Sequence, residues 1–237
     1  MLKQSWIQSD WLDEFDEEHD CKLEVAFQKG NLKMVLVLLE NGCATLKWGW
    51  YNMLECQTQD RMYIHKWTPL TLAVIQEGIP PKLRLEIVNF VLEFNQDLDT
   101  PDESYRTAAH WATIRGYPEI LQALLFKGAN VHKVDDKSET LMGYAIKKWT
   151  NTPAISIDLV KVLLKNNFDV NTTNKGGNTP LHLAVLASSK KIVGILLRYN
   201  ANKRQENDHG HRPIDIARIS GTPKMISLLK MSPQSSS

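Results

Sequence analysis

The sequence has few cysteines and no long apolar run. Its three cysteines, Cys21, Cys43 and Cys56, are an odd number without CxxC spacing, which argues against a disulfide framework and against a cysteine zinc site. No apolar stretch approaches the ~20 residues that a membrane-spanning helix needs, and the first residues lack the basic start and apolar run of a secretory signal. We therefore expect a soluble, cytoplasmic protein with reduced thiols and no membrane contact.

Catalytic sequence motifs are also missing. The sequence contains no GxxxxGK[ST] phosphate loop, no GxGxxG, no HExxH and no GxSxG, the short patterns that mark common nucleotide, metal and nucleophile sites. His209 and His211 could ligate a metal, but no third ligand lies near them in the sequence. We therefore expect no enzyme activity, no cofactor and no bound metal.

Charge of one sign is scarce in the chain as a whole, which carries a net charge of +1. The first 20 residues hold seven carboxylates and one lysine, a local charge of −6 that leaves +7 for residues 21–237. The basic residues of this body are few and interrupted by acids, so a nucleic-acid partner is not expected.

A pattern of residues recurs along the chain. It is most complete at 179–202, which begins with Thr-Pro-Leu-His-Leu-Ala, continues with apolar residues at helical spacing and ends in Asn-Ala-Asn. Further copies start at Thr68, Thr107, Thr140 and Arg212, and a degenerate copy lies near Ala26 and Gly30. Successive starts from Thr68 onward are 39, 33, 39 and 33 residues apart.

A 33-residue period that begins with Thr-Pro-Leu-His resembles the ankyrin repeat. The resemblance implies an all-α solenoid of stacked antiparallel helix pairs joined by β-turn or hairpin loops. It covers 21–230, and we predict repeats at 21–46, 63–100, 102–133, 135–172, 174–203 and 207–230. Two of the copies gain six residues between their helices, at 79–84 and around 150–156, and we expect these inserts to project from the edge opposite the turn tips.

The best copy also predicts its own helix ends. Thr179 is a capping residue and Pro180 suits the first helical turn, while apolar spacing predicts a second helix over 190–198. Asn200 can end that helix in the left-handed conformation. The resemblance further implies that His110 and His182, the histidines of the motif, make structural hydrogen bonds.

Three segments lie outside the regular pattern. In 1–20, Ile7, Trp11 and Phe15 share one helical face, so we predict an acidic helix that caps the first repeat; alternatively it covers the basic groove and blocks it. The irregular insertion 44–66 is rich in aromatic residues and is expected to fold back on its neighbours, or else to form an aromatic contact site. The tail 231–237 is expected to be disordered.

The resemblance places partner contacts at the turn tips and on the exposed side of each first helix, which together line a concave groove. The helix positions seven and eight residues after each start are Ile75 and Gln76, Ile114 and Arg115, Lys147 and Lys148, Leu186 and Ala187, and Ile219 and Ser220. The predicted partner-binding residues are Trp67, Arg106, Trp111, Arg115, Lys137, Tyr144, Lys147, Lys148, Lys175, His209 and His211.

Two features distinguish this set. The middle of the groove is basic, through Arg106, Arg115 and the lysine pair 147–148. Trp111 and Tyr144 stand where the family usually has a partly buried leucine, so packing between repeats and partner binding are equal alternatives for them.

The sequence therefore predicts a monomeric protein-interaction scaffold that binds an acidic or mixed segment of another protein. One alternative is an adaptor, or an effector secreted by an intracellular bacterium or a virus, that recruits host machinery. A remote third alternative is an enzyme, whose turnover would depend on His209 or His211.

Overall fold

The structure is a computed structural model that describes residues 26, 29–32, 35, 67–94 and 97–230. The predicted N-terminal helix 1–20, the insertion 44–66 and the tail 231–237 lie outside these residues. The chain divides into two compact units, with the boundary between Val91 and Leu92. The regular elements of the described residues are helices, joined by turns and loops in which Val134 and Thr140 form an isolated β-bridge. None of the helices in this described part is both long and apolar enough to cross a membrane.

The first unit contains helix α3 (Pro69–Ile75) and nearly all of helix α4 (Pro81–Leu92). Thr68 caps α3, because its hydroxyl accepts the backbone N–H of Thr71 at 3.1 Å. The buried guanidinium of Arg84 donates to the carbonyl oxygens of Val74 at 2.9 Å and Ile79 at 3.2 Å. The last carbonyls of a helix have no intrahelical partner, so Arg84 satisfies the end of α3.

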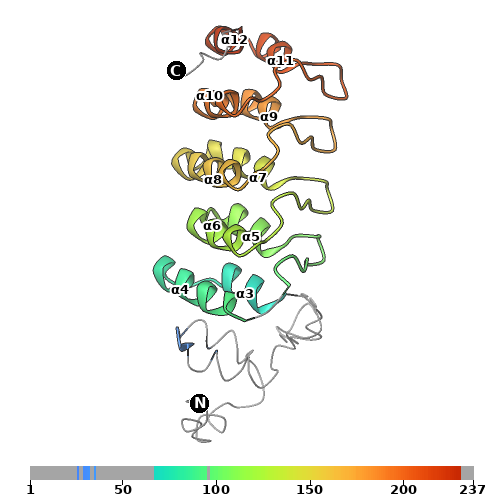
Figure 1. Cartoon of the computed structure of the whole chain (residues 1–237). Helices are drawn as coiled ribbons and strands as arrows, with labels where there is room; N and C mark the ends of the chain where they lie inside the picture. The colour runs from blue at the N-terminus through green and yellow to red at the C-terminus, as the bar shows by residue number, and fades with distance from the viewer. Residues whose placement is uncertain (1–25, 27–28, 33–34, 36–66, 95–96, 231–237) are drawn as a thin grey trace, which may run out of the picture. The chain divides into compact units, whose positions relative to one another are not determined.

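The second unit is a stack of four helix pairs. These are α5 (Ala108–Arg115) with α6 (Pro118–Phe126); α7 (Leu141–Lys147) with the 3₁₀ turn η2 (Lys148–Thr150) and α8 (Pro153–Lys165); α9 (Pro180–Leu186) with α10 (Lys190–Arg198); and α11 (Pro213–Ile219) with α12 (Pro223–Lys230). The first helices α5, α7, α9 and α11 form one layer and the second helices form the other (Figure 1). Each helix packs on its pair partner and on its counterpart in the next pair. The predicted all-α solenoid of helix pairs is confirmed.

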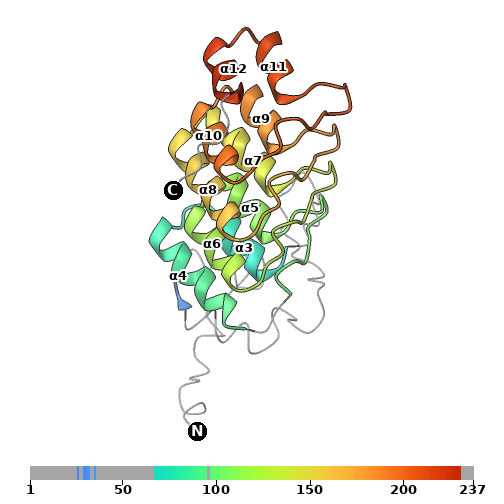
Figure 2. The same ribbon diagram turned by 45° about the horizontal axis from the view of Figure 1, so that its top comes forward.

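The loops that precede α7, α9 and α11 leave the stack on the same side, next to the first helices (Figure 2). A pair of short helices cannot cover its own apolar face, so burial has to be shared between neighbours. Leu181 and Ala184 of α9 and Ile192 and Leu196 of α10 are accordingly completely buried. The predicted bounds of the second helix, 190–198, are confirmed by α10.

The two inserts do not simply project. Helix α8 has 13 residues and α4 has 12, against nine in α6 and α10, so part of each insert lengthens the second helix. The last residue of the second insert, Ser156, is completely buried, and its hydroxyl donates to the carbonyl oxygen of Ala145 at 2.7 Å. Arg84, the last residue of the first insert, plays the same part in its own repeat. The expectation that the inserts project is therefore wrong for these two positions, because both side chains satisfy carbonyls at the end of the first helix.

The histidines of the repeat motif are structural, as predicted. Nδ1 of His110 accepts the backbone N–H of Thr107 at 3.2 Å, and Nδ1 of His182 accepts that of Thr179 at 3.1 Å. In the last pair a carboxylate takes this role: Oδ2 of Asp215 accepts the N–H of Arg212 at 3.1 Å. In these three pairs, the side chain of the third residue of the first helix therefore accepts the backbone N–H of the residue that precedes the helix.

Helix α7 is built differently, because Gly143 stands at the histidine position. The carboxylate of Glu139 fills the space instead, and a Cβ atom at position 143 would overlap its Oε1 atom. That oxygen is buried without a hydrogen-bond partner among the described residues. A buried polar atom without a partner is destabilising. Gly143 therefore leaves the space that the Glu139 carboxylate needs, but the buried carboxylate lowers the stability of the fold.

Restoring the histidine should stabilise the fold. We expect Glu139→Ala combined with Gly143→His to raise the free energy of unfolding by about 1–2 kcal/mol, because a hydrogen-bonded imidazole replaces a buried carboxylate oxygen that has no partner. Urea unfolding of the wild type, both single variants and the double variant measures the effect. Gly143→His alone should be less stable than the double variant, since the ring and the carboxylate compete for one space. A double variant no more stable than the wild type would contradict this account.

Candidate functional site

The loops that precede the first helices of the second unit share one backbone device. Each begins with an Asp or Asn whose Oδ1 atom accepts two backbone N–H groups, which closes a tight turn. In the first loop Asp102 accepts from Ser104 and Arg106, both at 2.9 Å. The same bonds join Asp135 to Lys137 and Glu139, Asn174 to Gly176 and Asn178, and Asn207 to His209 and His211.

Neighbouring loops are also joined to each other. The backbone N–H of Asp136 donates to the carbonyl of Ser104 at 3.0 Å, and that of Asp208 donates to the carbonyl of Gly176 at 3.3 Å. The tip of the first loop is therefore joined to that of the second, and the tip of the third loop to that of the fourth.

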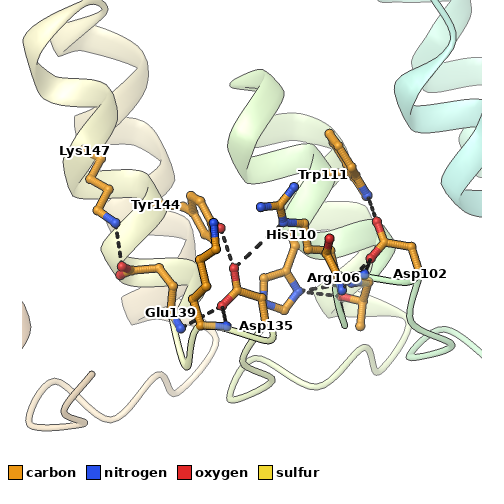
Figure 3. A network of polar contacts seen from close by, with 11 residues as sticks. Asp102, Arg106, His110, Trp111, Asp135, Glu139, Tyr144 and Lys147 are labelled. Atoms are coloured by element: carbon orange, nitrogen blue, oxygen red, sulfur yellow. Dashed lines mark hydrogen bonds and ion pairs between the residues drawn. The ribbon is translucent and has the colours of Figure 1, made fainter. Parts of the chain in front are cut away.

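Figure 3 shows a cluster of polar and aromatic side chains between the first two loops and helices α5 and α7. The indole N–H of Trp111 donates to Oδ2 of Asp102 at 2.8 Å. The hydroxyl of Tyr144 donates to Oδ2 of Asp135 at 2.5 Å, and Nε of Arg106 lies 3.8 Å from the same oxygen. The Arg106 guanidinium lies 5.5 Å from the centre of the Trp111 ring and 6.0 Å from that of Tyr144, within the range of cation–π attraction.

The electrostatics of this cluster fix its protonation at neutral pH. Burial alone would raise the pKa of Asp135, but hydrogen bonds from Tyr144 and from the amides of Glu139 and Lys137, with the nearby Arg106, hold it below its ordinary value. Burial, together with the hydrogen bond to Asp135, raises the pKa of Tyr144 to about 12. The phenol therefore stays neutral and donates, while the carboxylate is charged and pairs with the guanidinium.

Lys147 is tied to the chain as well. Its Nζ atom lies 2.5 Å from Oε2 of Glu139 and 5.5 Å from the centre of the Tyr144 ring. Of the predicted basic groove, Arg106 and Lys147 are thus paired with carboxylates of this chain. Arg115 is exposed and Lys148 is half-buried; the end of the Lys148 side chain lies beside Gly116, which ends helix α5. The C-terminus of a helix favours a cation, so Lys148 lies where its charge is stabilised.

The carboxylates and aromatic rings of the cluster follow a rule within this chain. The turn residue is hydrogen-bonded to the residue nine positions later in the sequence: Asp102 pairs with Trp111, and Asp135 pairs with Tyr144. In the last two loops the turn residue is Asn174 or Asn207, and the residue nine positions later is Leu183 or Ile216. A carboxylate has a second acceptor oxygen that needs a donor, whereas an amide brings its own N–H group.

This rule gives Trp111 and Tyr144 a structural role, and their binding of a partner stays a prediction. Their polar atoms donate to the turn residues of their own repeats, so packing within the scaffold accounts for both rings. The signal was present in the sequence, because an aromatic donor occurs only where the turn residue is Asp in these four loops.

The remaining predicted residues are dispersed. Trp67 belongs to the first unit, where it is half-buried directly before the cap Thr68. Lys137 and Lys175 are exposed at the tips of the second and third loops. The rings of His209 and His211 stack with centroids 6.3 Å apart, and the carbonyl of His211 accepts Nε2–H of His182 at 2.9 Å. No group of three metal-ligating residues occurs in the described part of the chain.

The structure also exposes large side chains that are not among the predicted partner-binding residues, although two of them stand at the helix positions where the resemblance places contacts. Tyr105 is 64% exposed at the first tip, and Leu186 and Ile219 are 56% and 72% exposed at the ends of α9 and α11. The backbone of Tyr105 is left-handed, with φ 58°. The corresponding residues of the next three loops are Ser138, Gly177 and Gly210, all with positive φ.

The helix pairs, the capped first helices and the joined hairpin tips define a helical repeat protein of the kind that presents an edge and a helical face to other molecules. The sequence matches the family described as "Ankyrin repeats (3 copies)" over residues 23–135 and 144–235. The chain belongs to the ankyrin-repeat family, whose repeats generally mediate protein–protein interaction.

Several relatives share part of this sequence. It is 29% identical to the human B-cell lymphoma 3 protein over 118 residues, 50% of this chain and 25% of that protein. It is 29% identical over 126 residues to a probable serine/threonine-protein kinase of Dictyostelium discoideum, 53% of this chain and 14% of the kinase. It is 29% identical over 174 residues to the ankyrin repeat and KH domain-containing protein mask-1 of Caenorhabditis elegans, 71% of this chain and 6% of that protein. The chain therefore spans a quarter or less of the length of these relatives.

The pairing of turn residue and aromatic donor can be tested by exchange. We expect Trp111→Leu to lower the free energy of unfolding by about 3 kcal/mol, because it removes a large ring and leaves a carboxylate oxygen of Asp102 without its donor. Adding Asp102→Asn should recover part of this loss, since Asn with Leu is the native combination at Asn174 and Leu183. Urea unfolding of the four proteins gives the coupling energy. Strictly additive effects would show that the two residues do not act as a pair.

Acid should destabilise the scaffold through its buried histidine. Burial lowers the pKa of His110 from 6.5 to about 4, so the unfolded chain binds a proton that the folded chain refuses between these values. The contribution is complete above pH 6.5 and is lost as the pH falls toward 4, by about 3 kcal/mol in total. Urea unfolding across this range measures the loss. His110→Asn should be less stable at pH 7 but should show a flatter pH dependence; an unchanged slope would contradict the assignment.

Proposed function

We propose that this chain is a scaffold that binds a protein partner through its loop tips and the exposed side of its first helices, with no reaction of its own. The observation that carries the proposal is Tyr105. A bulky residue in the left-handed conformation costs roughly 1–2 kcal/mol, and two of the four equivalent positions hold glycine, Gly177 and Gly210, for which that cost is absent.

Folding does not explain why a tyrosine stands there. The ring is mostly exposed, and no hydrogen bond or ring contact of its side chain occurs within the described residues. Strained backbone persists where function requires it, and exposed tyrosines are frequent anchors of protein interfaces. The joined tips of the first two loops also expose Glu103, Asp136 and Lys137, charged residues of both signs such as form the polar rim of an interface.

The proposed interface predicts opposite effects on stability and binding. We expect Tyr105→Gly to raise the free energy of unfolding by about 1 kcal/mol, because glycine adopts positive φ without strain. The same variant should lose the partner, measured by affinity capture from cell lysate with quantitative mass spectrometry of wild type and variant side by side.

Ser138→Gly is the matched control, because it relieves the same backbone conformation in the next loop without removing a ring. It should gain stability and keep the captured proteins. If Tyr105→Gly captured the same proteins in the same amounts as the wild type, the tip would not be the interface.

The adaptor alternative and the enzyme alternative make different predictions from the same capture. An adaptor or a secreted effector would recover a catalytic assembly of a host cell, such as a ubiquitin ligase, together with its direct partner. An enzyme would show turnover that disappears on substitution of His209 or His211. We favour the scaffold, acting in a cytoplasm as a monomer, because the mostly exposed Tyr105 at the joined tips of the first two loops is typical of a contact surface.

A further inference from the structure

In each pair of the second unit, a short connection leads from the end of the first helix to the start of the second. The third connection reads Leu-Ala-Ser-Ser-Lys-Lys over 186–191, and the fourth reads Ile-Ser-Gly-Thr-Pro-Lys over 219–224. Both join an aliphatic residue to lysine through small residues, and neither contains an acidic or aromatic residue. Because α9 packs on α11 and α10 packs on α12 (Figure 1), the two connections lie side by side. We call residues 186–191 and 219–224 together the connection edge.

The aliphatic residues of the connection edge are exposed. Leu186 and Ile219 both stand seven residues after the start of their repeats, and they are 56% and 72% exposed. At the same position α5 has the half-buried Ile114, and α7 has Lys147, which is paired with Glu139. A largely exposed aliphatic side chain at this position therefore occurs in the last two pairs of the unit and not in the first two.

The lysines of the connection edge, Lys190, Lys191 and Lys224, are also exposed. None of the three makes a side-chain hydrogen bond or an ion pair within the residues that the structure describes. Lys191 and Lys224 directly precede the first buried apolar residue of their second helices, whereas Glu119 and Asp158 stand at this position in α6 and α8. The charge at this one position thus changes from negative to positive along the stack.

Acidic residues of the neighbouring elements leave this positive charge in place. Asp158 of α8 lies 3.6 Å from Lys161 of the same helix. Asp215 of α11 lies 2.9 Å from Arg218 and belongs to the first turn of that helix, whereas Ile219 is its last residue. The other two acids of 179–230, at positions 206 and 208, belong to the loop before α11. The connection edge therefore offers cations and aliphatic side chains together.

The turns of the connection edge stand clear of the rest of the unit. Ser188 and Gly221 have positive φ, 54° and 60°, and both are exposed. A Cβ atom added to Gly221 would meet nothing within 4 Å. The turn at Gly221 therefore does not form the wall of a pocket, and a flat surface has access to it.

We propose that the connection edge binds an anionic lipid surface, with Leu186 and Ile219 at the boundary of the acyl chains and the three lysines at the headgroups. The residue types favour lipid over protein, because protein interfaces are enriched in arginine and aromatic residues and depleted in lysine. The inference goes beyond the proposed function, since Tyr105 takes no part in this contact. The sequence-based expectation of no membrane contact rested on the missing apolar run, and a contact with the membrane surface requires no such run.

The size of the effect follows from the number of charges. Each lysine or arginine near an anionic membrane strengthens binding about fivefold, so three lysines contribute about a hundredfold. The two aliphatic residues add an apolar contribution that does not depend on salt. We therefore expect reversible binding that requires anionic lipid and that weakens, without disappearing, as the ionic strength rises.

Sedimentation of the whole chain with lipid vesicles tests the inference. We expect binding to phosphatidylcholine vesicles in which about one lipid in three is phosphatidylserine, and little binding to phosphatidylcholine alone. Replacing all three lysines, with Lys190→Gln, Lys191→Gln and Lys224→Gln, should weaken binding about a hundredfold and remove most of its salt dependence. Leu186→Ser with Ile219→Ser should weaken binding about tenfold and leave the salt dependence unchanged.

Matched variants separate these effects from a change in net charge or in general apolarity. Lys133→Gln, Lys165→Gln and Arg204→Gln together remove three exposed cations outside the connection edge. Phe126→Ser removes an 81% exposed apolar side chain at the end of α6. Both should bind the vesicles as the wild type does, and urea unfolding should show that all variants are folded.

Three results would overturn the inference: equal binding to vesicles with and without phosphatidylserine, no binding to either, or the same loss of binding in the matched variants as in those of the connection edge. A chain that ignores the vesicles, while its connection-edge variants lose proteins captured from lysate, would show that this edge is a protein interface and that the lipid inference is wrong.

Discussion

The second unit depends on a single side-chain oxygen at the start of each loop. Asp102, Asp135, Asn174 and Asn207 each accept two backbone N–H groups, and this turn brings the chain into the extended residue that caps the first helix. Backbone hydrogen bonds join the first turn to the second and the third to the fourth, so these loops add to the register that the apolar residues of the helix pairs set along the stack.

The fold could be predicted from the sequence because its signals are local and recur. Thr179 and Pro180 mark a helix start, Asn200 has the left-handed backbone expected after the next helix, and the period places each copy. The role of His182 followed from its place in the motif. The ends of the inserts could not be predicted in this way, because only the packed structure shows that Ser156 reaches the carbonyl of Ala145.

The candidate site was harder to predict from the sequence, because the net charge of a surface depends on ion pairs between residues of different repeats. Arg106 and Asp135 are 29 positions apart, yet their side chains approach to 3.8 Å; a row of cations read from the sequence therefore overstates the basic surface. The exposure of Leu186 and the positive φ of Tyr105 are likewise properties of the folded chain. An alignment of the repeats with one another would have singled out Tyr105, because Gly177 and Gly210 occupy the equivalent position in two other copies.

The change from Asp in the first two turns to Asn in the last two gives the stack a direction. Asp102 and Asp135 carry carboxylates, which acid can neutralise, whereas Asn174 and Asn207 carry amides, which it cannot. In a solenoid whose stability is shared between neighbours, loosening one end need not loosen the other. Strong acid should therefore unfold the unit first at the end that contains α5 and α7. Amide hydrogen exchange resolved by residue should show faster exchange there than in α9 and α11, because of the turn residues in the loops.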